Sequence, residues 1–230
     1  MKEIAAAIVL AAGSGTRMNT AVPKQFLELA GKPVIIHTLE KFEKSSFISD
    51  TVVVCHEDHI EDLRRLISKN KLRKVYKVVP GGETRQGSSF IGVKNCPPGT
   101  TFALIHDAVR PFINDTIISD TLEAAGAAGA AGTVVDMIDT VIVKNGDFIR
   151  DMPDRNNLKR AQTPQGFRYE TILTAHEWAL KNDIFDSTDD CGLVLAMGSP
   201  VKAVEGSVFN IKITDRADLA VAERLILEIE

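Results

Sequence analysis

Two glycines and two cations lie close together near the start of the chain. Gly13 and Gly15 follow an apolar run over residues 4–10, and Arg17 and Lys24 come shortly after them. A run of this kind is typical of a buried parallel strand. A glycine turn directly after such a strand lets backbone N–H groups approach a phosphate, and the cations add positive charge. The segment predicts a pocket for a polyphosphate, such as a nucleoside triphosphate.

The spacing of these glycines differs from two familiar phosphate-binding motifs. A P-loop has Gly-Lys-Ser or Gly-Lys-Thr at its end, whereas Gly15 is followed by Thr16 and Arg17. A dinucleotide fingerprint has Gly or Ala three residues after its second glycine, where this chain has Met18. The glycines alone fit an ordinary strand-to-helix turn equally well. It is the two cations that favour phosphate binding.

A second group of charged residues follows the apolar run 102–105. Asp107 comes at the expected carboxyl end of this strand, where ligands of parallel sheets bind. Mg²⁺ is usually held by one or two carboxylates plus substrate phosphates, so Asp107 is a candidate metal ligand, and Arg110 could clamp a second anion. The alternative is that Asp107 and Arg110 pair only with each other. We expect His106 to be structural, because an ionised phosphate oxygen can attack without a general base.

Two further segments carry polar residues with two interpretations each. Residues 81–89 (GGETRQGSS) contain Gly82, Glu83 and Ser88, which could read a base edge or simply cap a helix, and Arg85, which could be a structural strut. Lys212 stands inside a strand-like run over residues 209–214. By itself, this position favours a solvated face over a ligand contact.

The elements that position these residues alternate between strands and helices. Strands are expected at 4–10, 51–55, 75–79, 102–105 and 132–136, and helices at 34–44, 57–69, 84–94, 115–129 and 168–181. Such alternation predicts an α/β fold with a mostly parallel sheet covered on both faces. Ligands then bind at the carboxyl ends of the strands, where the glycine turn lies.

The pattern changes after the fifth strand. Residues 140–150 predict a β-hairpin with Asn145 and Gly146 at its turn. The segment 137–160 is polar, and we expect it to be either a lid or an arm that packs on a partner subunit. A further strand is expected over 201–211, followed by an amphipathic helix to about 229. Without repeats or a low-complexity linker, residues 1–230 are treated as a single domain.

Composition excludes several classes of protein. The chain has 230 residues and a formal net charge of −4, so nucleic acid is not an expected partner. We expect no membrane span and no signal peptide. Cys55, Cys96 and Cys191 are scattered and odd in number, which suits a reducing cytoplasm and argues against structural zinc.

Six motifs taken together resemble one family over essentially the whole chain. They are LAAGSGTRM at 10–18, PKQ at 23–25, GGETR at 81–85, HDAVRP at 106–111, QTPQGF at 162–167 and NIKIT at 210–214. In order and content they are similar to 2-C-methyl-D-erythritol 4-phosphate cytidylyltransferases of isoprenoid biosynthesis. The resemblance implies a mostly parallel Rossmann-like sheet of the nucleotide-diphospho-sugar transferase type, flanked by helices and carrying a protruding β-hairpin arm.

The resemblance also implies a reaction and a set of site residues. CTP and an alditol phosphate would give a CDP-alditol and pyrophosphate, with Mg²⁺ as cofactor. The residues expected to hold the triphosphate and stabilise its charge are Arg17, Lys24 and Lys212. Those expected around the nucleotide are Ala11, Ala12, Gly13, Gly15, Gly82, Glu83 and Ser88. Those expected at the alditol phosphate are Asp107, Arg110, Thr140, Arg155, Thr163 and Thr188, with Thr140 and Arg155 contributed by the 137–160 arm across a homodimer.

One motif departs from the family pattern and leaves the acceptor open. Many members have Thr-Asp-Glu-Ala-Ser where residues 188–192 read TDDCG. Ribitol-5-phosphate cytidylyltransferases, a sister group, share most motifs and can carry Asp-x-Cys nearby. The resemblance favours methylerythritol phosphate over ribitol phosphate. A nucleotide-binding regulator without activity is a further alternative, against which the presence of Arg17, Lys24, Asp107 and Lys212 argues.

Overall fold

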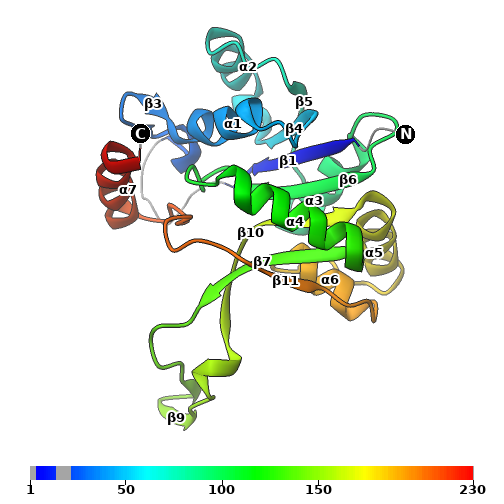
Figure 1. Ribbon diagram of the computed structural model, residues 1–230, viewed down its shortest axis with the longest axis vertical. Coiled ribbons are helices and arrows are strands. Elements are labelled where there is room, and N and C mark those ends of the chain that lie inside the picture. Colours follow the sequence, from blue (N-terminus) through cyan, green and yellow to red (C-terminus); the bar gives the residue numbers. More distant parts are fainter. Residues whose placement is uncertain (1–3, 14–21, 230) are drawn as a thin grey trace.

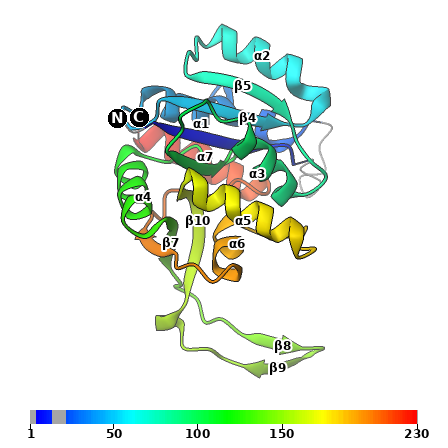
Figure 2. The same cartoon turned by 90° about the vertical axis from the view of Figure 1, so that its right-hand side faces the viewer.

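A seven-stranded sheet forms the centre of the molecule (Figures 1 and 2). The computed structural model describes residues 4–13 and 22–229. Along the sheet the order is β11-β7-β10-β6-β1-β4-β5. The strands are β1 (Ala5–Ala11), β4 (Asp50–Cys55), β5 (Val75–Pro80), β6 (Phe102–Asp107), β7 (Ala130–Asp136), β10 (Lys159–Arg168) and β11 (Lys202–Glu205).

The sheet is mostly parallel, as predicted. β1 pairs in parallel with β4 and β6, β4 with β5, and β7 with β11. Only β10 runs antiparallel, between β6 and β7. The neighbouring parallel strands β1, β4 and β6 therefore end at one edge of the sheet, which brings the segments that follow them together.

Helices cover both faces of the sheet because the central strands are apolar on both sides. α1, α2 and α4 pack on one face around Phe42 and Leu104, and α3, α5 and α6 pack on the other around Ile8 and Phe167. These helices are α1 (Val34–Lys44), α2 (Ile60–Lys69), α3 (Arg85–Lys94), α4 (Asp115–Ala128), α5 (Tyr169–Lys181) and α6 (Asp190–Ala196). Among the described residues, no helix has the length and apolar character to cross a membrane.

A smaller apolar cluster holds the last part of the chain against the edge of the sheet at which β1, β4 and β6 end. α7 (Arg216–Ile229) buries Ala222 and Ile226 against Leu29 and Phe112. The short strands β2 (Glu28–Leu29) and β3 (Lys32–Pro33) form a separate antiparallel pair beside it. Ile213 belongs to the same cluster and donates its backbone N–H to Val109, so the segment before α7 has a fixed position.

Most predicted elements are present in the structure, but one predicted strand is shorter, and β10, α6 and the short strands β2 and β3 were not predicted. The strand predicted over 201–211 ends at Glu205, and Lys212 lies in an irregular segment, so the strand-like run at 209–214 was wrong. β10 was not predicted as a strand. It contains Pro164, a residue that usually excludes a central strand, and its pairing with β7 shifts register between Ala161 and Gln165.

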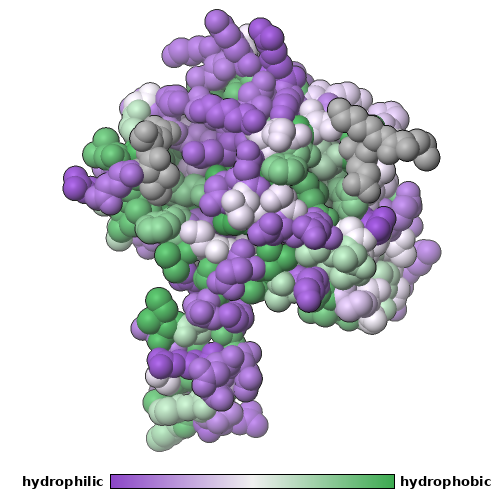
Figure 3. Space-filling view, in the orientation of Figure 1, coloured by the Kyte–Doolittle hydropathy of each residue, from purple (hydrophilic) through white to green (hydrophobic). Residues whose placement is uncertain are grey.

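The predicted hairpin is present. β8 (Val143–Asn145) and β9 (Phe148–Asp151) pair antiparallel as a separate two-stranded sheet, which lies away from the main sheet in both views (Figures 1 and 2). Residues 137–160, which include this hairpin, expose apolar side chains among hydrophilic ones (Figure 3). The exposed fraction is 80% for Phe148 and 75% for Ile138. We refer to residues 137–160 as the arm.

Two glycines in helices offer a matched test of the packing. A Cβ at Gly92 in α3 would lie 2.3 Å from Ile8 Cγ2, whereas a Cβ at Gly126 in α4 would meet Phe102 at an ordinary 3.6 Å. We expect Gly92→Ala to lower the free energy of unfolding by about 1–3 kcal/mol through overpacking. Gly126→Ala should leave it unchanged or raise it by up to about 1 kcal/mol. Urea denaturation of both variants measures the difference, and equal effects would contradict this packing.

Candidate active site

A cavity of about 470 Å³ lies at the carboxyl ends of β1 and β6 and beside the loop that follows β5. Most predicted residues of the nucleotide and triphosphate sites line it together. From different parts of the chain it gathers Leu10, Ala11, Ala12, Gly13, Lys24, Gln25, His56, Gly82, Glu83, Thr84, Arg85, Ser88, Asp107, Ala108, Val109 and Lys212. Gly15 and Arg17 lie outside the described residues, so their predicted roles stay predictions.

Asp107 is the centre of the charged group in this cavity. Its Oδ2 lies 2.9 Å from Lys212 Nζ and 3.4 Å from Arg110 Nε. Arg110 also donates from Nη1 to the backbone carbonyl of Asn210 at 2.8 Å. The prediction that Asp107 and Arg110 pair with each other therefore describes part of the arrangement, because Lys212 joins them from a distant segment.

The ionisation of Asp107 follows from these neighbours. Burial alone would raise the pKa of its carboxyl, but the positive charges of Lys212, Arg110 and Arg85 outweigh that effect. The pKa of Asp107 is therefore held well below its usual range, and the carboxylate stays ionised at neutral pH. Lys212 keeps 40% of its side chain exposed, so its charge is also available to a ligand in the cavity.

His106 is buried behind Asp107 and is held as a neutral ring. Its Nε2 lies 3.1 Å from the carbonyl of Arg110, and its Nδ1 lies 3.1 Å from Thr163 Oγ1. Burial lowers the pKa of His106 to about 4. A neutral ring facing a carbonyl carries its proton on Nε2, so Nδ1 accepts from Thr163. Thr163 Oγ1 in turn accepts from the backbone N–H of Asp107 at 3.1 Å. The expected structural role of His106 fits these contacts.

The end of β1 is held by a residue to which the sequence analysis gave no role. Gln25 is buried and donates from Nε2 to the carbonyls of Ala11 at 2.6 Å and Gly13 at 3.1 Å. Lys24 precedes it in the short 3₁₀ helix η2 (Lys24–Phe26). Because Gln25 is hydrogen-bonded to the end of β1, its neighbour Lys24 lies in the same cavity as Gly13. In the sequence, the position of Gln25 next to Lys24, a predicted phosphate ligand, is the feature that could have identified it.

The loop after β5 approaches the end of β1 very closely. A Cβ at Gly81 would lie 2.3 Å from Ala12 Cβ, so only glycine fits there. Thr84 caps α3 by accepting from the N–H of Gly87 at 3.0 Å. Ser88 Oγ accepts from the N–H of Gly82 at 3.1 Å. Helix capping therefore belongs to Thr84, while Ser88 fastens the loop and still lines the cavity.

Four residues predicted at the alditol phosphate differ in their placement. Thr163 is buried directly behind Asp107. Thr188 is exposed, just before α6. Thr140 and Arg155 belong to the arm, where Arg155 donates to the carbonyl of Ile138 at 2.8 Å. None of these four lines the cavity of this chain.

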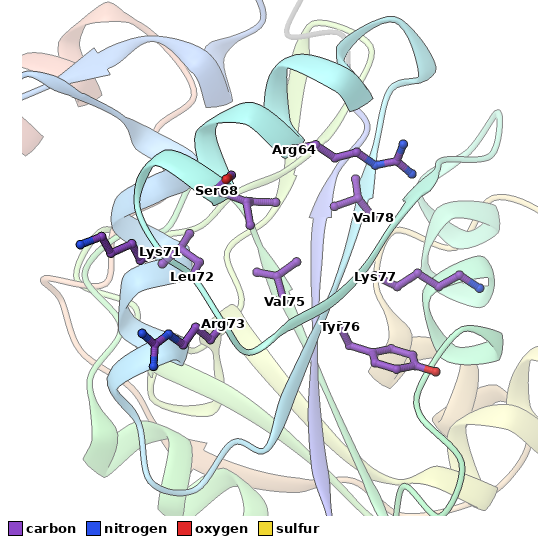
Figure 4. Close-up of a pocket in the computed structure, with 10 residues that line it drawn as sticks. Arg64, Ser68, Lys71, Leu72, Arg73, Val75, Tyr76, Lys77 and Val78 are labelled. Carbon is purple, nitrogen blue, oxygen red and sulfur yellow. The ribbon is translucent and has the colours of Figure 1, made fainter.

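A second cavity, of about 500 Å³, lies between α2 and β5 (Figure 4). Its lining includes Leu72 and Val75 with the cations Lys71 and Lys77, and none of the predicted site residues. Figure 4 shows the ends of Lys71 and Lys77 extending in opposite directions. Because these cations do not converge, we place the active site in the first cavity.

Among the described residues, the cavity offers a metal ion few protein ligands. Within residues 4–13 and 22–229, no group of three or more His, Cys, Asp or Glu side chains could hold a metal ion by itself. One carboxylate in a cavity fits Mg²⁺ that takes its other ligands from substrate phosphates and water. Asp107 provides that carboxylate, and both of its ion pairs use the same oxygen, Oδ2.

The buried neutral His106 predicts a pH dependence of stability. Unfolding returns its pKa from about 4 to about 6.5, so between these values the unfolded chain binds a proton that the folded chain does not. Stability is therefore lost as pH falls below 6.5. Between pH 7 and 5 this group should account for about 2 kcal/mol of the loss.

His106→Gln provides the comparison for that prediction. The amide can still donate to the carbonyl of Arg110, but it does not titrate. We expect the free energy of unfolding of His106→Gln to fall less between pH 7 and 5 than that of the wild type. Chemical denaturation at both pH values measures this difference. Parallel pH slopes in the two proteins would contradict the buried neutral ring.

Comparisons with known proteins find relatives along nearly the whole chain. The sequence profile of the 2-C-methyl-D-erythritol 4-phosphate cytidylyltransferases matches residues 5–228. A ribitol-5-phosphate cytidylyltransferase from Vibrio parahaemolyticus is 43% identical, over 96% of this chain and 94% of its own length. A 2-C-methyl-D-erythritol 4-phosphate cytidylyltransferase from Clostridium botulinum is 41% identical, over 95% and 96%.

A solved structure supports the same assignment. That of 4-diphosphocytidyl-2C-methyl-D-erythritol synthase from Anaerococcus prevotii superimposes with a TM-score of 0.85 at 29% identity, covering 98% of this chain and 99% of that one. The profile match spans nearly the whole chain, including the motifs that meet in the cavity. The chain belongs to the 2-C-methyl-D-erythritol 4-phosphate cytidylyltransferase family.

Proposed function

We propose that this protein joins CTP and 2-C-methyl-D-erythritol 4-phosphate to give 4-CDP-2-C-methyl-D-erythritol and pyrophosphate. The observation that carries the proposal is the cavity in which Lys24, Lys212 and Asp107 lie together with Ala12 and Gly13 after β1. A site that handles two anionic substrates needs cations, and this cavity gathers them at the edge where sheets of this type bind ligands. The family match supplies the reaction.

The reaction needs positioning and charge stabilisation more than it needs acid or base groups. A phosphate oxygen of the alditol phosphate attacks the α-phosphorus of CTP. The new O–P bond forms as the bond to the β-phosphate oxygen breaks, and pyrophosphate leaves with that electron pair. The attacking oxygen is already ionised, which agrees with a His106 that is buried and neutral. Lys24 and Lys212 line the cavity and would stabilise the negative charge that builds up on the α-phosphate.

Asp107 and Mg²⁺ complete the proposed arrangement. Asp107 holds Lys212 in the cavity through the 2.9 Å ion pair. It is also the proposed carboxylate ligand of Mg²⁺, which would neutralise triphosphate charge and polarise the reacting phosphate when bound. Arg110 keeps Asp107 in place from the buried side.

The acceptor is proposed as methylerythritol phosphate because the matching profile and the Clostridium botulinum relative bear that name. Ribitol phosphate is the second candidate, since the relative from Vibrio parahaemolyticus is 43% identical and is named for that substrate. Residues 188–192 (TDDCG) also differ from the common family motif.

Pyrophosphate release tests the proposal directly. Purified protein is given CTP with methylerythritol phosphate, ribitol phosphate or neither, and each reaction is repeated with EDTA in place of Mg²⁺. We expect release with methylerythritol phosphate and loss of activity with EDTA. Faster release with ribitol phosphate would reassign the acceptor. No release with either acceptor, under conditions where CTP binds, would favour a regulator without activity.

We also propose that the protein is a homodimer whose arm completes the partner's acceptor site. Thr140 and Arg155 stand on the arm and do not line the cavity of their own chain. Phe148, Ile149 and Met152 expose apolar surface there, at 80%, 57% and 59%. Apolar side chains grouped on a protruding segment are typical of a contact surface.

Removing the charge of Lys24 from the cavity should affect turnover and not folding. We expect Lys24→Ala to lower kcat by about 10²–10³-fold, because the charge is needed most in the transition state. Lys181→Ala, an exposed lysine on α5, is the control and should retain wild-type kcat. Thermal melts show whether both variants are folded. A near-normal kcat for Lys24→Ala would remove this residue from the catalytic group.

The shared site predicts complementation between inactive variants. Lys24→Ala and Arg155→Ala are each expected to be weakly active alone. In a heterodimer of the two, one site receives Lys24 from one subunit and Arg155 from the other, so co-refolded equal mixtures should regain about one quarter of wild-type activity. Co-refolding each variant with itself is the control. Activity no higher than that of the parents, or a monomer mass by light scattering, would show that the arm serves its own chain.

A further inference from the structure

Arg85 lines the nucleotide cavity but has no role in the mechanism above. It is the first residue of α3, directly after the cap residue Thr84. Its Nη1 donates to Asp190 Oδ2 at 2.8 Å, and 26% of its side chain is exposed. Two interpretations are open: Arg85 is a strut between α3 and α6, or it is held at the cavity wall for a ligand.

Asp190 is a fully buried carboxylate at the start of α6. Its other oxygen, Oδ1, accepts from Ser89 Oγ at 2.6 Å and lies 3.3 Å from His176 Nε2. Its backbone N–H donates to Gln165 Oε1 at 3.0 Å. Burial would raise the pKa of Asp190, but His176 and Arg85 outweigh that effect and lower it. The carboxylate therefore stays charged and rigidly placed, with Oδ2 directed to Arg85.

The guanidinium of Arg85 has donors left over. Among the described residues its hydrogen bond to Asp190 uses Nη1 alone, so Nε and Nη2 donate to no protein group. If Arg85 only connected α3 to α6, its side chain would not need to be exposed. Arg85 keeps 26% of its side chain exposed and lines a cavity that also contains Lys24 and Lys212. An arginine held on one side and open on the other is suited to bind acceptor oxygens of a ligand.

We propose that Arg85 is a further nucleotide-contacting residue and that Asp190 is the positioning residue that holds its guanidinium at the cavity wall. The proposal rests on the proposed function, since it takes the nucleotide to be the ligand of this cavity. Arg85 comes from the same loop–helix junction as Gly82, Glu83 and Ser88. It comes from none of the segments proposed for the acceptor. Its partner on the ligand is an anionic or carbonyl oxygen of the nucleotide.

Steady-state kinetics with two variants test the proposal. Asp190→Asn keeps the size of the side chain but removes the charge that holds Arg85. Arg85→Lys keeps the ion pair but replaces the forked donors with a single ammonium group. For both we expect KM for CTP to rise about tenfold, with a smaller change in kcat and no change in KM for the acceptor. Calorimetric titration with CTP and Mg²⁺ should show the same loss of affinity.

Ser89→Ala is the matched control because it removes a hydrogen bond to Oδ1, the oxygen that does not bind Arg85. It should lower the melting temperature and leave KM for CTP unchanged. If Asp190→Asn does not fold, Arg85→Lys alone decides the question. Unchanged KM for CTP in the folded variants, or a rise only in KM for the acceptor, overturns the proposal and makes Arg85 a strut. A wild-type protein that binds CTP but releases no pyrophosphate contradicts the proposed function separately.

Discussion

A carboxylate buried at the end of a central strand has to be neutralised, and Asp107 organises the site for that reason. Arg110 and Asp107 keep only about a tenth of their side chains exposed, at 10% and 12%. Removing one partner of such a pair costs about 3–5 kcal/mol. Lys212 is 40% exposed, so solvent screens its ion pair with Asp107, which contributes less to stability than the buried pair with Arg110. Hydrogen bonds to backbone carbonyls bring the segment before α7 to the end of β6, from Ile213 to Val109 and from Arg110 to Asn210, and this places Lys212 beside Asp107.

The same constraint explains the neutral groups behind Asp107. A charged imidazole at His106 would add a cation in a place where no solvent reaches it, and burial keeps its pKa at about 4. The ring instead connects the Arg110 carbonyl to Thr163, and Thr163 connects onward to the N–H of Asp107. β10 must pass between β6 and β7 to bring Thr163 there. The antiparallel strand is therefore part of the support for the site.

The order of apolar and polar residues predicted those strands and helices that form from local sequence alone. The apolar runs gave β1, β4, β5, β6 and β7, and periodicity gave α1 with its observed bounds, Val34–Lys44. β10 was missed because Pro164 opposes a central strand, and only pairing on both sides makes it one. Gln25 was not assigned because its contact with Ala11 cannot be seen in the spacing of the sequence. Arg85 was considered as a strut, but its partner Asp190 could not be identified from the sequence for the same reason. The position of Lys212 in the sequence favoured a solvated face. Its role at the triphosphate was predicted only from the resemblance of the motifs to those of the family.

Buried carboxylates hold two of the cations of the cavity: Asp107 holds Lys212, and Asp190 holds Arg85. The two carboxylates are not equivalent. Asp190 is fully buried, so its carboxylate contacts only protein groups, which are Ser89, His176 and Arg85 among the described residues. Asp107 lines the cavity itself and would repel an incoming phosphate. A cation between Asp107 and the phosphate removes that repulsion. Lys212 carries a single positive charge, which is less than the negative charge of a triphosphate. We therefore expect Asp107 to face the phosphates through a divalent cation, whereas Asp190 acts only through the arginine that it positions.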